Sequence, residues 1–184
     1  KKMRKNRNHM RVYVLMLSKA FPKEHAKAGQ WTYFEFALKM ALERRKEWLV
    51  ISGEGETVVK VPKLHTIRTN YERWEKRIKA IQEGKAELSI RQWKGRPYEK
   101  GNVQIEIARL GKNSGIGIEK LFLHKSEDGC PDGGTIESIP ISGELLAIND
   151  GLGYSDWRTW FKDFDEAVPL PIIHFTKFRY GKQE

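Results

Sequence analysis

Three side chains that could bind an anion or take part in catalysis, those of Lys63, Thr66 and Arg68, lie within the six-residue segment Lys63-Leu64-His65-Thr66-Ile67-Arg68. A lysine held near a hydroxyl can activate that hydroxyl as a nucleophile, and a lysine beside a guanidinium can bind an anion. Along a strand, Lys63 and Thr66 have opposite parity and point to opposite faces. They converge only if Lys63 lies in a turn before a strand that begins near His65, and Pro62 favours such a turn. The alternative is that Thr66 is simply a good strand former beside two solvated cations.

A second group of cationic and aromatic residues lies about thirty residues further along the chain, at Arg91, Trp93, Lys94 and Arg96. Alternation in the strand-like run 88–93 places Arg91 and Trp93 on one face. An arginine beside a tryptophan can hold a phosphate and a stacked base together. The alternative is ordinary packing of a tryptophan at the end of a strand.

The overall charge points to a polyanionic partner. The 184 residues include 34 Lys and Arg against 24 Asp and Glu, which gives a net charge of +10 and favours nucleic acid or a nucleotide. The single cysteine cannot form an internal disulfide, and the five histidines show no metal-ligand spacing, so we expect neither a metal nor another cofactor. The apolar run 12–17 is too short for a membrane span or a signal-peptide core, so we expect a cytoplasmic protein without a membrane partner.

Hydrophobic periodicity predicts a mixture of helices and strands. We expect strands over 11–18, 57–61, 88–93, 103–110, 116–124 and 172–178, with a hairpin turn at Gly53 to Gly55. Helices are expected over 32–46, from a cap at Asn70 to Gly84, over 142–148, and after a cap at Ser155. The glycine-rich stretch 128–134 is typical of a loop. Residues 1–10 form a basic arm, and 11–184 fit one domain with an insertion near 33–60.

The spacing Lys63-x-x-Thr66-x-Arg68 resembles the signature segment of the ASCH domains, which are relatives of the PUA fold. Later segments are similar in order, namely Glu87 to Arg91, Val103 to Leu110, Leu145 to Leu152 and Ile172 to Phe175. The resemblance covers roughly residues 11–180. It implies an α+β fold, a small mixed or antiparallel PUA-like β-barrel with flanking helices. The pattern of strands and helices alone does not define a barrel.

The resemblance implies two functions of different classes. The first is binding of RNA or a modified nucleotide in a basic cleft that contains Lys63, Thr66 and Arg68, flanked by the cationic and aromatic group near Trp93. The second follows from small bacterial ASCH proteins that deacylate N-acetylcytidine with a Lys, a Thr and a Glu. These positions fall on Lys63, Thr66 and Asp150, and Asp is one methylene shorter than Glu, which removes about 1.5 Å of reach. A ribonuclease is a third, weaker option in the same family.

Overall fold

The computed structural model describes residues 10–45, 49–53, 56–95 and 99–181. The strands are β1 (Arg11–Met16), β2 (Leu49–Gly53), β3 (Glu56–Lys60), β4 (His65–Ile67), β5 (Ala86–Trp93), β6 (Gln104–Leu110), β7 (Gly117–Lys125), β8 (Pro131–Ile136), β9 (Ile139–Ser142) and β10 (Leu170–His174). The helices are α1 (Phe34–Leu42), α2 (Tyr71–Gln82), α3 (Gly143–Asn149) and α4 (Tyr154–Trp160). The predicted α+β class is confirmed. The predicted basic arm lies outside the described residues, except for its last residue, Met10.

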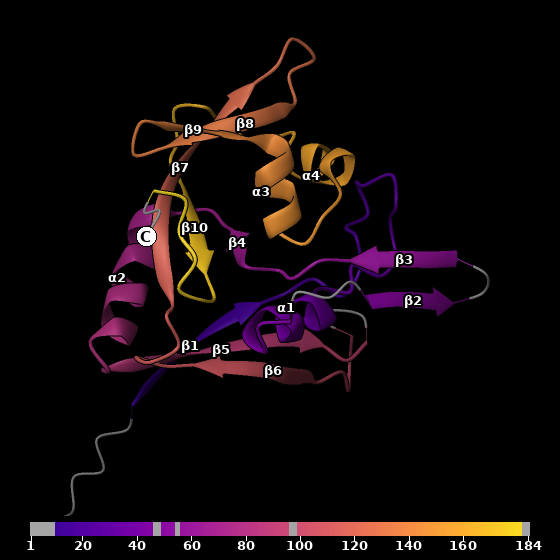
Figure 1. The fold of residues 1–184 in the computed structure, drawn as a ribbon. Helices are drawn as coiled ribbons and strands as arrows, with labels where there is room; N and C mark the ends of the chain where they lie inside the picture. The colour runs from indigo at the N-terminus through magenta and orange to yellow at the C-terminus, as the bar shows by residue number, and fades with distance from the viewer. Residues whose placement is uncertain (1–9, 46–48, 54–55, 96–98, 182–184) are drawn as a thin grey trace, which may run out of the picture.

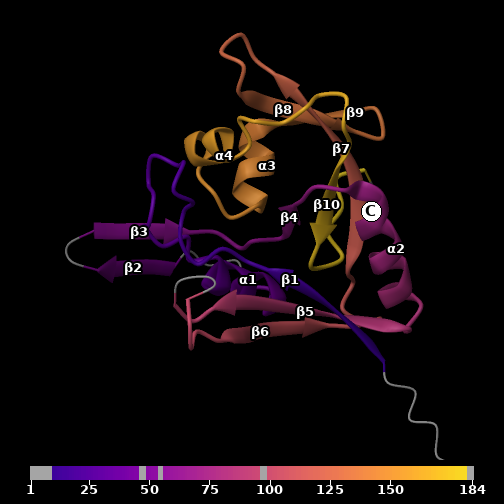
Figure 2. The same cartoon turned by 180° about the vertical axis from the view of Figure 1, so that it is seen from behind.

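Two main sheets form the body of the molecule. One has the order β1-β5-β6, with β1 and β5 parallel and β5 and β6 antiparallel; the other has the order β4-β10-β7-β8-β9 and is antiparallel throughout. Figures 1 and 2 show α2 on one side of β7 and β10, with α3 and α4 on the other side. The predicted insertion near 33–60 comprises α1 and the antiparallel β2–β3 hairpin, which projects from the body in Figure 1.

Local signals located several element ends correctly. Asn70 caps α2 by accepting a hydrogen bond from the Arg73 backbone N–H, and Gly84 follows that helix with a φ of +74°. Ser142 caps α3 in the same manner, through the Leu145 backbone N–H. These signals succeed because a cap is formed by residues adjacent in the sequence.

Three expectations about the C-terminal half were wrong. The helix α4 begins two residues earlier than a Ser155 cap implies, after Gly153 and without a side-chain cap. The expected loop 128–134 contains the start of β8, whose glycines Gly133 and Gly134 approach β9 and β7 too closely for a Cβ atom. The last strand ends at His174 and not at residue 178, because Arg179 donates hydrogen bonds to the Thr176 and Phe178 carbonyls and folds the chain back.

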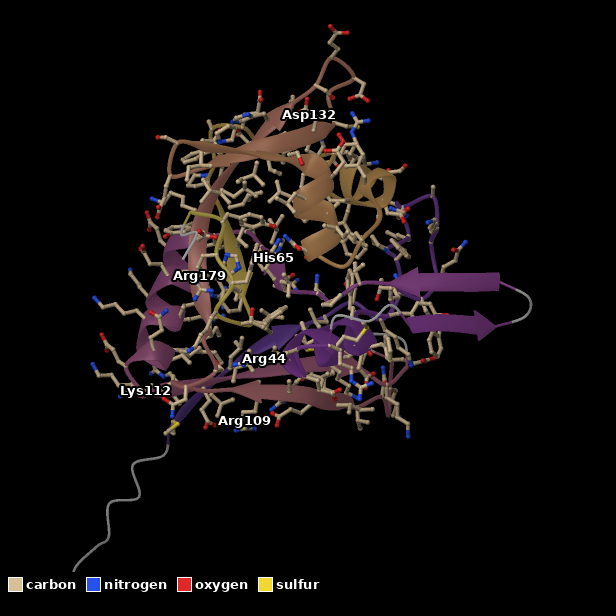
Figure 3. The ribbon with its side chains drawn as sticks, in the orientation of Figure 1. Arg44, His65, Arg109, Lys112, Asp132 and Arg179 are labelled. Carbon is tan, nitrogen blue, oxygen red and sulfur yellow. The ribbon has the colours of Figure 1, made fainter. Side chains whose placement is uncertain are left out.

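The core joins the two sheets through α2, which packs on β5, β7 and β10. Trp74, Ile78 and Ile81 form the buried face of α2, and Leu88 and Ile90 of β5 belong to the same core. Polar groups are buried in the same interior, and Figure 3 shows His65 between β10 and α3. None of the helices found in the described residues has the length and apolarity needed to cross a lipid bilayer.

Candidate functional site

Lys63 lies in the turn immediately before β4, which begins at His65, as the convergence of Lys63 and Thr66 requires. Its backbone N–H donates to the Ala37 carbonyl of α1 at 2.9 Å, and the next N–H, of Leu64, donates to the Asn149 carbonyl at the end of α3 at 2.8 Å. The Phe175 N–H donates to the Leu64 carbonyl at 2.9 Å. Main-chain bonds to three distant parts of the chain therefore fix where the lysine side chain begins.

The Lys63 ammonium and the Asp150 carboxylate form a buried pair. Lys63 is 1 % and Asp150 3 % exposed, and Lys63 Nζ lies 2.5 Å from Asp150 Oδ1. Lys63 Nζ also donates to the Asp150 backbone carbonyl, at the C-terminal end of α3, and lies 4.1 Å from the centre of the Phe34 ring. Gly151 makes this approach possible, because a Cβ atom there would meet the Lys63 side chain at 3.2 Å. The lysine therefore also caps the C-terminal end of α3, where a cation interacts favourably with the negative end of the helix dipole.

Burial shifts both members of the pair toward their neutral forms. Loss of solvation lowers the pKa of Lys63, and the Asp150 carboxylate partly restores it. Loss of solvation likewise raises the pKa of Asp150, and Lys63 and then Arg68 act in the opposite direction. The pair is stable only as a unit, since either charge alone would be buried without compensation.

Thr66 faces the same small hollow as this pair. The hollow has a volume of about 30 Å³, and Lys63, Thr66, Arg68 and Asp150 all line it. Among the described residues, no hydrogen bond joins the Thr66 hydroxyl to Lys63. A hollow of this size accommodates a single water and not an acyl group. The three residues that the ASCH resemblance suggested as catalytic thus line one hollow, with the lysine already engaged by the aspartate.

Arg68 links the small hollow to a much larger cleft. Its side chain lines both, and its Nη2 donates to the Met16 carbonyl at the end of β1 at 2.6 Å. The Arg68 Nε is buried and has no hydrogen-bond partner among the described residues. Burial lowers the pKa of Arg68 and Asp150 raises it, but an arginine keeps its charge in proteins. An unpaired buried N–H is costly, and this Nε has no exposed surface in the cleft, so the part of Arg68 that can meet a ligand is the rest of its side chain.

The cleft has a volume of about 740 Å³ and lies between the end of β1, the β1–α1 connection and the end of β5. Its lining combines cations with aromatic rings and includes Lys19, Phe21, Trp31, Arg68 and Trp93. The volume is within the range of about 300–1,000 Å³ that ligand sites occupy. Sequence patterns did not identify Lys19, Phe21 or Trp31, because they lie in an irregular connection.

The remaining predicted binding residues do not all reach the cleft. Arg91 donates to Ser89 Oγ at 2.8 Å within a polar network on β5 and β6, and is not among the described residues that line the cleft. Lys94 is exposed, and its backbone carbonyl accepts a hydrogen bond from Lys19 Nζ at 2.5 Å across the cleft. Arg96 lies outside the described residues. Arg68 and Trp93 are therefore the two predicted binding residues that the fold brings to one surface.

A buried histidine cluster lies behind the pair. His65 Nε2 lies 2.7 Å from the Tyr180 hydroxyl, and His174 Nε2 lies 2.6 Å from Glu119 Oε2. Burial lowers the pKa of both histidines, strongly for His65, and Glu119 partly restores that of His174. Burial tends to raise the pKa of Glu119, but hydrogen bonds from His174 and from the Gly181 and Tyr180 N–H groups leave it below the ordinary value.

No grouping of three or more His, Cys, Asp or Glu side chains in the described part of the chain is placed to hold a metal ion. Comparison of the chain with protein-family models, with curated proteins and with solved structures gave no match. The geometry of the cleft and the hollow is therefore the basis for a function.

Proposed function

We propose that this protein binds single-stranded RNA or a nucleotide in the cleft formed by Arg68, Trp93 and the β1–α1 connection. The principal support is the combination in that cleft of the aromatic residues Phe21, Trp31 and Trp93 with the cationic residues Lys19 and Arg68. Unpaired bases stack on aromatic side chains, and an arginine fork matches a phosphate or a base edge. The net charge of +10 favours the same partner.

The proposal agrees with the ASCH resemblance of the segment from Lys63 to Arg68. Three further predictions accompany the proposal. They are membership of the ASCH family, closure of the two sheets into a PUA-like barrel, and a cytoplasmic location. In this proposal Lys63 and Asp150 help to position Arg68, because they fix the end of α3 against the turn before β4, the strand that Arg68 follows.

Fluorescence anisotropy with a labelled single-stranded RNA tests the proposal between about 50 and about 300 mM salt, over which phosphate contacts lose affinity steeply. Arg68→Lys keeps the charge but loses the planar fork, so we expect roughly five- to hundredfold weaker binding, corresponding to about 1–3 kcal/mol for a bidentate contact. Arg109→Lys is the matched control, because Arg109 pairs with Glu87 and Glu106 on the exposed side of β6.

Two results would contradict the proposal. One is the absence of RNA binding at low salt, and the other is an affinity that does not change with salt. Equal affinities of Arg68→Lys and the wild type would remove Arg68 from the contact. Thermal midpoints of both variants control for the lost bond between Arg68 and the Met16 carbonyl.

Amide hydrolysis on an acylated cytidine is the second candidate function. It is favoured by the presence of Lys63, Thr66 and Asp150 around one hollow and by the lowered pKa of Lys63. The engagement of Lys63 by Asp150 and the small volume of the hollow favour binding instead. Release of cytidine from N-acetylcytidine, compared between the wild type and Thr66→Val, decides the matter, and equal rates would exclude Thr66 as a nucleophile. Cleavage of the RNA probe in the same preparations tests the ribonuclease option.

A further inference from the structure

Trp31 is an exposed aromatic residue on a fixed backbone. Its side chain is 59 % exposed, yet its main chain forms a β-bridge with Ala20. The next residue, Thr32, is buried and forms hydrogen bonds through both its backbone and its side chain. Its N–H donates to the Lys19 carbonyl at 3.0 Å, and its hydroxyl donates to the Ser18 carbonyl at 2.7 Å. The indole is therefore presented to solvent from a position that the backbone holds in place.

Trp31 separates two hollows. The larger is the 740 Å³ cleft, and the smaller has a volume of about 170 Å³ and is lined by Tyr33, Phe36 and Gln92. Lys19 and Trp31 line both hollows, so the indole and the lysine form their common wall. Lys19 Nζ lies 4.9 Å from the centre of the Trp31 ring, and the rings of Trp31 and Tyr33 are 6.1 Å apart.

The smaller hollow suits one ring of an extended ligand. Its volume is below the roughly 300–1,000 Å³ of sites that enclose a complete small ligand. Tyr33, which lines it, is held at a φ of +58°, a conformation that non-glycine residues rarely adopt. Such backbone conformations persist where the surrounding structure imposes them and cluster at ligand sites.

The charges around the smaller hollow favour a backbone phosphate. Lys60 Nζ lies 5.6 Å from the centre of the Tyr33 ring, and Lys39 is paired with Glu35 at 2.7 Å. Lys19 and Lys39 line the smaller hollow together with one carboxylate, Glu35, and Lys60 adds a positive charge beside Tyr33. A phosphate that joins two nucleotides across Trp31 would meet positive potential on both sides of the indole.

We infer that the ligand extends across Trp31, and that the protein binds a single-stranded oligonucleotide of at least two nucleotides, with neighbouring bases on the two sides of the indole. This inference rests on the proposed function and narrows its ligand class from nucleotides in general to oligonucleotides. A side chain between two successive bases is sequence-tolerant, because every base has a π-face.

The test compares uridine 5′-monophosphate with a labelled oligouridylate of about eight nucleotides, a length within the range that single-stranded sites cover. Binding is measured for the wild type, Trp31→Ala and Trp31→Phe at one low salt concentration. We expect Trp31→Ala to weaken oligouridylate binding by a factor on the order of tenfold larger than the factor by which it weakens monophosphate binding, whereas Trp31→Phe keeps most of the affinity for both probes. Phe122→Ala, an exposed aromatic position on β7, is the control and should bind as the wild type does.

Each result has a distinct meaning. If the wild type binds oligouridylate and Trp31→Ala binds it equally well, the extension across Trp31 is wrong while the proposed function stands. If Trp31→Ala weakens both probes by the same factor, Trp31 belongs to a single-nucleotide site and the inference is also wrong. If neither probe binds the wild type, the proposed function fails and the inference fails with it.

Discussion

At the scale of single residues, the structural contacts of the Lys63 ammonium compete with the catalytic role considered for it in the second candidate function. Its Nζ satisfies the carbonyl at the end of α3 and the Asp150 carboxylate, which are structural contacts. The same Nζ lines a hollow with Thr66 and has a lowered pKa, which is the property of a catalytic base. Structural ion pairs perturb pKa values in the same way, so stability measurements separate the two roles more directly than sequence patterns do.

The pair predicts opposite pH trends for its two single variants. Lys63→Met leaves a carboxyl whose folded pKa is raised above 3.8, so the folded state holds more protons and the stability deficit should shrink as pH falls. Asp150→Asn leaves a lysine whose folded pKa is below 10.5, so its deficit should shrink as pH rises. Near neutral pH the free energy of unfolding of each variant should be about 3–5 kcal/mol lower than that of the wild type.

Urea unfolding of both variants against the wild type at about pH 5, 7 and 9 measures these trends as differences in the free energy of unfolding. Parallel pH dependence of the two variants would show that the pair is not the source of the loss. Replacement of both residues, as Lys63→Met with Asp150→Leu, should recover much of the stability, because no uncompensated charge remains in the interior.

At the scale of elements, the short strand β4 and the helix α2 position the site. The strand β4 has three residues and pairs with β10, and Arg68 follows it directly and donates its N–H to the Pro171 carbonyl at 3.0 Å. Two residues later, Asn70 begins α2 with a φ of +64° and a side-chain cap. The direction in which the chain leaves the site therefore depends on one asparagine.

Asn70 makes two separable contributions to the start of α2. Asn70→Ala should destabilise the protein by about 1–3 kcal/mol for two reasons. It removes the cap, and it places alanine at positive φ, where its Cβ is strained and no side-chain hydrogen bond offsets the strain. Asn70→Gly removes the cap but relieves the conformational cost, so its loss should be only a few tenths of a kcal/mol. Equal losses in thermal or urea unfolding would contradict a role for the left-handed conformation.

At the scale of the whole molecule, a buried polar interior connects the elements. His65 of β4 and His174 of β10 are paired in register, with ring centres 5.6 Å apart, and Glu119 of β7 and Tyr180 near the C-terminus complete the cluster. Both histidines have a buried Nδ1 without a hydrogen-bond partner among the described residues. Protonation of either ring would place a charge in the core.

The histidine cluster predicts loss of stability on mild acidification. Burial lowers the folded pKa of both rings below 6.5, so the unfolded chain binds more protons below that pH and the free energy of unfolding falls as pH decreases. Each excess proton contributes a slope of up to about 1.4 kcal/mol per pH unit. Urea unfolding between about pH 7.5 and 5.5 should show this slope. The variant His65→Gln should lower the slope by the contribution of one proton, up to about 1.4 kcal/mol per pH unit. An unchanged slope in His65→Gln would exclude that ring.

Local physics determined much of this protein from its sequence. The order Pro62, Lys63, then a strand from His65 requires only neighbouring residues, and so do the caps at Asn70 and Ser142. The periodicity of α2 likewise identified its buried face correctly. These features follow from backbone and side-chain geometry within a few residues, which is the range over which sequence patterns are informative.

Tertiary structure alone decided what surrounds Arg68. Its contact with the Met16 carbonyl spans 52 residues. The cleft also joins Phe21 and Trp31, which lie in a connection without a periodic pattern, to Trp93 at the end of β5. The distance between Lys63 and Asp150 spans 87 residues and depends on how α3 docks against the turn before β4. Such contacts arise from the packing of whole elements, and the hydrophobic burial that drives packing is non-directional, so no local pattern encodes which polar side chains will meet.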